Sequence, residues 1–124
     1  MLYAARLEDF ITPDEFIRQS GVGIGGRVQK VIDAAVIKVC DPYVPYATGR
    51  LARSVHLATT IGSGEITYDT PYARDVYYPA SDGGKARHYN TAIHQLAGPY
   101  WFDRAMADHG EDILKEARDA AAHR

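Results

Sequence analysis

The sequence predicts an α+β fold in which a small antiparallel sheet, a hairpin plus one or two further strands, packs against a long helix and a C-terminal helix. Apolar residues recur at helical spacing in 26–40 and again after residue 100. Between them, segments 55–61 and 65–69 alternate between apolar and polar residues, as half-buried strands do. The length of 124 residues fits a single domain, 1–124.

Two helices are predicted in the first third of the chain. Thr12–Glu15 combines a capping threonine, a proline and an acidic residue, which indicates the start of a short helix. A longer helix is predicted from Gly26 to Cys40, and Asp41-Pro42 should end it because a residue before proline disfavours the α conformation. Asp33 lies off the apolar stripe of this helix and is expected to face water.

A β-hairpin is predicted in the middle of the chain. Leu51–Ser54 should form a single helical turn, Val55–Ile61 a strand, Gly62–Gly64 a turn and Glu65–Asp69 a second strand. An isolated hairpin is marginally stable in water. We therefore expect a further strand, for which Leu2–Leu7 is the candidate, or an edge supplied by a neighbouring copy of the chain.

The last third is predicted to contain a short helix, a long loop and the C-terminal helix. Pro71–Tyr78 should be helical with Thr70 as its cap. The segment 79–99 has little periodicity and is predicted to be a long interaction loop. The final helix begins near Tyr100, and the polar, alanine-rich end, 119–124, should be a frayed tail.

The overall composition excludes several classes of function. The net charge of −2 is unlike that of proteins that grip nucleic acid through a basic surface. The longest apolar runs are far shorter than the roughly 20 residues of a membrane-spanning helix. A single cysteine, Cys40, cannot form an internal disulfide.

Neither a cofactor nor a metal ion is expected. Gly21, Gly23 and Gly26 have the spacing of a dinucleotide-binding loop, but the segment before them looks helical, whereas such a loop follows a buried strand. The five histidines do not pair with one another or with Cys40 at zinc-ligand spacing.

A hydrolase is an alternative interpretation of three residues in the middle of the chain. In the predicted strand, Ser54 and His56 would share one face, and Asp69 would lie on the partner strand. The sequence has no nucleophile elbow and no sign of an oxyanion hole. We therefore expect no catalytic residues.

Nine tyrosines are unusually many for a chain of this length, and most of them flank turns and loops. A tyrosine combines apolar area with a polar tip, which suits surfaces that become buried on assembly. As a set they favour an interaction protein over an enzyme.

The most informative segment is Asp41–Ser54, DPYVPYATGRLARS. Its two prolines hold the chain extended, Thr48-Gly49 should form a turn with a positive φ at Gly49, and Leu51 should anchor the segment in the core. By its own physical chemistry, the segment is a rigid connection.

The string D-P-Y-V-P-Y-x-T-G-x-L-x-x-S resembles the minor capsid proteins of tailed double-stranded DNA phages, which are similar to the wider neck and tail-completion group. Tyr68–Arg74, Tyr77-Tyr78 and Trp101-Phe102 follow in the same order, so the resemblance covers about 21–115. The residues that carry it are Asp41, Pro42, Tyr43, Pro45, Thr48, Gly49, Leu51, Ser54, Tyr68, Pro71, Tyr72, Ala73, Tyr78, Trp101 and Phe102.

The resemblance implies a structural subunit of the virion, assembled in the host cytoplasm, within the ring-shaped connector that joins head and tail. Its partners would be other copies of itself in a homo-oligomeric ring, an adaptor or stopper protein on one side, and a tail terminator or tail tube protein on the other. Phage DNA would pass nearby without specific binding, and no membrane would be involved. The alternatives are a small phage-encoded hydrolase and a soluble binding module.

Overall fold

The structure is a computed structural model, and it describes residues 2–6, 26–84, 89 and 91–122. The predicted start of an N-terminal helix, Thr12–Glu15, lies outside the described residues. The elements are β1 (Tyr3–Arg6), α2 (Gly26–Cys40), η2 (Asp41–Tyr43), α3 (Arg50–Ala58), β2 (Glu65–Tyr68), α4 (Ala73–Tyr77), η3 (Ala80–Asp82) and α5 (Trp101–Ala122), where η denotes a 3-10 helix.

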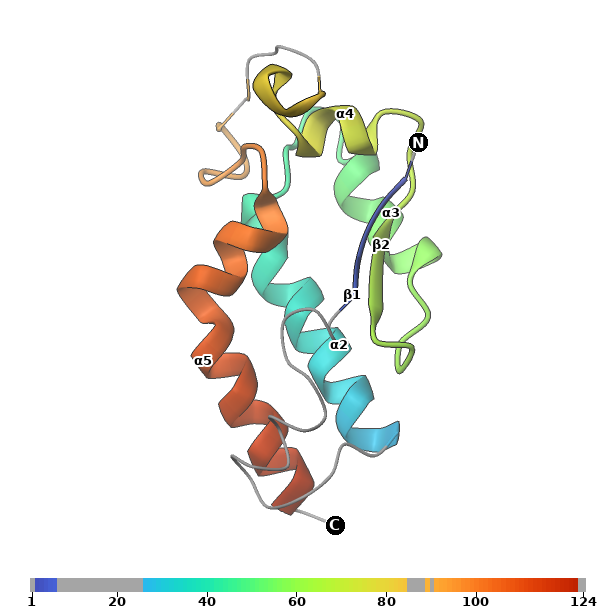
Figure 1. Ribbon diagram of the computed structural model, residues 1–124, viewed down its shortest axis with the longest axis vertical. Helices are drawn as coiled ribbons and strands as arrows, with labels where there is room; N and C mark the ends of the chain where they lie inside the picture. The colour runs from blue at the N-terminus through green and yellow to red at the C-terminus, as the bar shows by residue number, and fades with distance from the viewer. Residues whose placement is uncertain (1, 7–25, 85–88, 90, 123–124) are drawn as a thin grey trace.

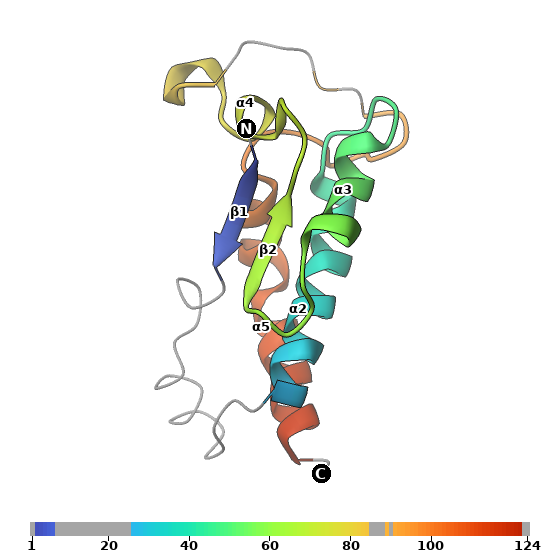
Figure 2. The ribbon, with the colours of Figure 1, turned by 90° about the vertical axis from the view of Figure 1, so that its right-hand side faces the viewer.

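The two long helices, α2 and α5, lie side by side and run in opposite directions (Figure 1). On the other side of α2, the strands β1 and β2 and the helix α3 form a second layer, in which α3 lies beside β2 (Figure 2). The short α4 closes one end of this layer. This arrangement confirms the predicted α+β class, with an antiparallel sheet packed against a long helix and a C-terminal helix.

Helix α2 has the predicted bounds at both ends. Its buried face includes Val28, Ile32 and Val36 at the spacing of one helix side. After Cys40 the chain continues into η2, which contains Pro42. Pro42 has no backbone N–H, and its ring disfavours the α-helical conformation of the residue before it. The helix therefore ends where the sequence indicates.

The predicted strand Val55–Ile61 is wrong, because residues 50–58 form α3. The inward face of this helix consists of Leu51, Ala52, Ser54 and Val55, which recur at helical spacing. Leu57, which the alternating pattern placed on the apolar face of a strand, is 92% exposed. Small inward residues concealed the helical period, and the alternation was coincidental.

The partner of β2 is β1, so the hairpin prediction is wrong and the prediction of an N-terminal strand is confirmed. The strands are antiparallel, with Tyr3 opposite Tyr68 and Arg6 opposite Glu65. At the open end of this ladder the Arg6 Nε donates to Glu65 Oε2 over 3.3 Å. The predicted turn at Gly62–Gly64 instead connects α3 to β2.

Side-chain hydroxyls occupy the outer edge of β2. Thr59 Oγ1 accepts the backbone N–H of Thr67 over 2.9 Å and donates to the carbonyl of the same residue over 3.2 Å. Ser63 Oγ accepts the N–H of Glu65 over 3.2 Å. Because both backbone groups of Thr67 point away from β1, this edge is already satisfied within the chain and needs no strand from a neighbour.

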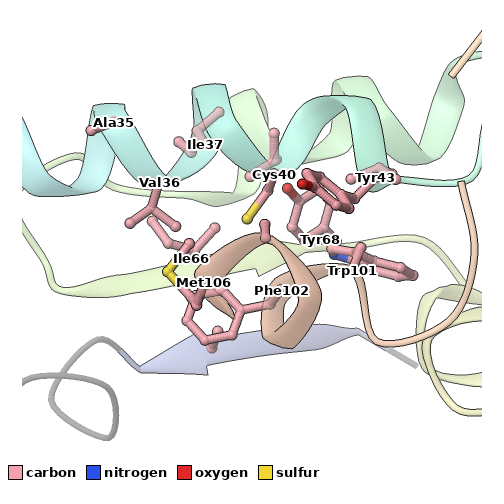
Figure 3. Packing of buried hydrophobic residues seen from close by; sticks show 14 of the residues in the cluster. Ala35, Val36, Ile37, Cys40, Tyr43, Ile66, Tyr68, Trp101, Phe102 and Met106 are labelled. Carbon is pink, nitrogen blue, oxygen red and sulfur yellow. The ribbon is translucent and has the colours of Figure 1, made fainter. Parts of the chain in front are cut away.

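The aromatic part of the core surrounds Trp101, whose side chain is fully buried at the start of α5 (Figure 3). Tyr77 and Tyr68 meet the indole ring edge-on, with centroids 4.6 and 5.4 Å from it, and Tyr3 stacks on Tyr77. Cys40 is buried nearby, and burial raises the pKa of its thiol to about 12. Several tyrosines that the sequence suggested for assembly surfaces are therefore core residues.

The short helix α4 is present as predicted, but Thr70 is not its cap. The N-cap is Tyr72, and Thr70 is buried, with its carbonyl accepting the N–H of Ala73 over 3.3 Å. The expected frayed tail differs too: α5 continues to Ala122, and Ala121 is buried. Its alanine side packs inward, which keeps the end of the helix in place.

Candidate functional site

The segment that connects α2 to α3, residues 41–49, forms a rigid corner against α5. Tyr43 is buried there, and its hydroxyl donates to Asp108 Oδ2 over 2.5 Å. This hydrogen bond to a carboxylate raises the pKa of Tyr43. The Arg104 guanidinium lies 5.3 Å from the centroid of the same ring, and Val44 next to it is fully buried. One aromatic side chain thus fixes the corner to the C-terminal helix.

Gly49 ends this corner and begins α3 with φ at +85°, as the sequence predicts. A Cβ at this position would lie 2.6 Å from Tyr46 Oη and would also collide with the Arg53 guanidinium. Arg53 N–H donates to the Gly49 carbonyl over 2.9 Å, which starts the helix. Glycine is therefore required both by the backbone conformation and by the close approach of Tyr46.

Ser54 has a structural role in α3. Its hydroxyl donates to the Leu51 carbonyl over 2.7 Å and accepts the N–H of Asp69 over 3.2 Å, which adds a third hydroxyl to the edge of β2. His56 is exposed, because side chains two positions apart on a helix point to nearly opposite sides and Ser54 points inward. The hypothetical Ser54–His56–Asp69 constellation is therefore not assembled.

The corner contributes one wall of an open pocket of about 330 Å³. Its lining comes from residues 45–51, Tyr72, Val76 and Tyr89. Arg50 lies over the Tyr72 ring at 6.0 Å, and the Tyr89 hydroxyl donates to the Val76 carbonyl over 2.9 Å. The walls are mostly apolar and aromatic, which suits the binding of an apolar side chain more than chemistry on a substrate.

The fifteen motif residues thus divide into three groups. Pro45, Thr48, Gly49, Leu51 and Tyr72 line the pocket. Tyr43, Tyr68, Ala73, Trp101 and Phe102 are buried, and Ser54 satisfies backbone groups, so these residues build the scaffold. Asp41 is half-buried, Pro42 and Pro71 are exposed, and Tyr78 lies beneath the Arg74 guanidinium at 5.2 Å.

No local pattern in the sequence indicated the role of His94, which lies in the predicted interaction loop. Its Nδ1 lies 2.7 Å from the Val44 carbonyl, and because a carbonyl only accepts, Nδ1 carries the hydrogen. Nε2 then faces Asp41 Oδ2 at 3.5 Å, and the ring meets Tyr46 edge-on at 4.8 Å. The hydrogen bond to Val44 and the ring contact with Tyr46 attach residues 91–99 of the loop to the corner.

Asp33 was also missed, and its predicted exposure to water is wrong. The side chain is fully buried, and its Oδ2 accepts the N–H groups of Gly62 and Gly64 over 2.6 and 3.1 Å. Oδ1 accepts Gln29 Nε2 over 2.8 Å. The two glycines lie about thirty residues away in the sequence, so helical periodicity alone could not reveal these contacts.

Within the described ranges, no three His, Cys, Asp or Glu side chains gather as a metal-ligand set. The helices in the described part of the chain are too short or too polar to cross a bilayer. A sequence model for the family described as minor capsid protein matches residues 24–121. No curated protein and no solved structure matches the chain.

Proposed function

This chain belongs to the minor capsid protein family, and from that membership we propose that it forms part of the ring-shaped head–tail connector of a tailed phage, in a neck or tail-completion role. As a minor capsid protein it is a structural component of the phage virion and not an enzyme. The match over 24–121 agrees with the resemblance in 21–115, and the geometry of Ser54 and His56 separately argues against a hydrolase.

The observation that supports a connector role is the surface around the corner, which offers apolar docking sites and no assembled catalytic residues. The pocket at the corner is open and has aromatic walls. Beside it, the loop anchored by His94 exposes Ile93 at 62% and Leu96 at 47%. Exposed apolar residues around a fixed pocket are typical of surfaces that a protein partner covers.

The proposed partners are further copies of the chain in a ring, an adaptor or stopper protein on the head side, and a tail terminator or tail tube protein on the tail side. Phage DNA would pass nearby without specific contacts. A net charge of −2 is consistent with that, because a passage through which DNA slides should hold few cations that bind phosphate.

A deletion of the gene, complemented from a plasmid, tests the proposal. We expect purified wild-type virions to contain the chain by mass spectrometry. We expect the deletion to yield DNA-filled heads and free tails in electron micrographs, and the plasmid to restore joined particles. Normal joining without the gene, or absence of the chain from purified virions, would contradict the connector role.

The binding-module alternative has its own measurement. A salt-sensitive affinity of the purified chain for DNA would favour it, since phosphate contacts release counterions.

A further inference from the structure

The outer face of α3 carries two cationic side chains followed by an exposed apolar one. Arg50, Arg53 and Leu57 follow one another at spacings of three and four residues and are all exposed, so they form one stripe, here called the α3 stripe. At 92%, Leu57 is the most exposed of the large hydrophobic residues that the structure describes. Within the part of the chain that the structure describes, neither Arg50 nor Arg53 forms an ion pair, and α3 contains no acidic residue.

The outer face of α5 has the opposite charge. Asp103 and Glu111 are exposed and lie four residues on either side of Ala107, which is also exposed; these three residues are here called the α5 stripe. Asp108 and Asp112 add two further exposed carboxylates to the same half of the helix. A small side chain between acids leaves a shallow apolar position with a negative rim.

The two stripes match in spacing as well as in charge. Arg53 lies four residues from Leu57, about 6 Å along the helix axis, and Asp103 and Glu111 each lie the same distance from Ala107. If Leu57 rests on Ala107, Arg53 therefore meets a carboxylate whichever way the two helices run. An apolar centre with charged groups around it is the usual composition of a specific interface.

The stripes cannot meet within one molecule. Helix α5 lies on one side of α2, and α3 lies with β2 on the other (Figure 1). A contact between two different patches on opposite sides of a subunit is heterologous, and it repeats from copy to copy until a ring closes.

We propose that the occupant of the α3 stripe is the α5 stripe of a second copy of this chain, and that this contact builds the ring. The inference rests on the proposed connector function and deepens it by assigning the two surfaces. DNA is the competing occupant of the two arginines, but a phosphate backbone would give Leu57 no apolar partner.

A charge swap tests the contact in virions. The phage that lacks the gene is complemented with Arg53→Glu, with the pair Asp103→Arg and Glu111→Arg, or with all three substitutions. We expect each reversal to lower the number of copies per virion about tenfold or more, because like charges then face each other, and the triple variant to recover most of the loss. Lys38→Glu, an exposed reversal on α2, is the matched control and should leave the copy number unchanged.

Cross-linking tests the pairing directly. The natural thiol, Cys40, is fully buried and gives little background. In assembled particles under mild oxidation, the double variant Leu57→Cys, Ala107→Cys should give a ladder of covalent oligomers, and neither single variant should. A dimer from Leu57→Cys alone would indicate a symmetric contact and overturn the proposal.

The remaining outcomes separate this inference from the connector function. Any of three results would refute the contact: an unchanged copy number in the charge reversals, no recovery in the triple variant, or no ladder in particles that contain the double variant. The proposed function would still stand as long as the wild-type chain is in the virion. Salt-sensitive DNA binding that Arg53→Glu abolishes would assign the α3 stripe to DNA. Absence of the wild-type chain from virions would instead refute the function.

Discussion

Replacing Asp33 by alanine removes three hydrogen bonds, two of which connect α2 to the turn before β2, while the third lies within α2. A hydrogen bond to a charged group contributes about 1.5–3 kcal/mol. Gln29, Gly62 and Gly64 are only half-buried, so water can replace part of each contact. Counting the two backbone bonds at the low end, we expect Asp33→Ala to lower the free energy of unfolding by about 3 kcal/mol.

Asp33→Asn should cost less, about 1–2 kcal/mol, because the amide oxygen can still accept both glycine N–H groups and Gln29 can rotate its amide. Urea unfolding followed by the fluorescence of the single tryptophan, Trp101, measures both variants, since this side chain is fully buried. With a typical slope, 3 kcal/mol moves the urea midpoint by about 1–3 M. Exposed Glu111→Gln is the control, expected within about 0.5 kcal/mol of wild type. A loss below about 1 kcal/mol in Asp33→Ala would refute the reasoning, because the turn would not depend on the carboxylate.

Gly49→Ala should lower the free energy of unfolding by about 1–3 kcal/mol in the same assay. The loss should exceed that of Gly83→Ala, because Gly83 has a similar φ of +90° but open space where a Cβ would lie. Equal losses would show that Tyr46 and Arg53 move away from the new methyl group. Ser54→Ala should cost about 1–2 kcal/mol by leaving the N–H of Asp69, just after β2, without its acceptor, whereas exposed His56→Ala should be neutral for stability and for phage infection. Raising the pH should destabilise the fold: the Cys40 thiol has a pKa of about 12 when folded against 9.0 in its reference state, so the unfolded chain loses the proton first and stability falls between these values. Buried tyrosines, whose pKa is also raised, add to this loss, which the urea midpoint measured from pH 8 upwards would show, and a constant midpoint would contradict it.

Local sequence signals were sufficient where a physical rule acts on neighbouring residues. Helix α2 was predicted at both ends, because its apolar stripe is continuous and Pro42 restricts the backbone just after it. The positive φ at Gly49 was likewise predictable, since few other residues adopt it without strain.

Contacts between distant segments were not predictable in this way. Glu65–Tyr68 pairs with a strand about sixty residues earlier, and neither has a turn that indicates its partner. The roles of Asp33 and His94 depend on backbone groups that arrive from elsewhere in the fold. For 50–58, two periodicities fitted the same residues, and only packing beside β2 decided for the helix, which placed Leu57 outside.

Before assembly, a subunit of this kind must remain soluble in the cell that makes it. A strand edge with unpaired backbone groups recruits strands from other chains and begins aggregation. The hydroxyls of Ser54, Thr59 and Ser63 protect one edge of β2 and the residue after it, because they accept the backbone N–H groups there from within the chain. Copies therefore cannot join by extending the sheet at that edge. In the ring proposed above, contacts on this side of the sheet would be made by side chains, whose contacts can form and separate until the correct neighbours are in place.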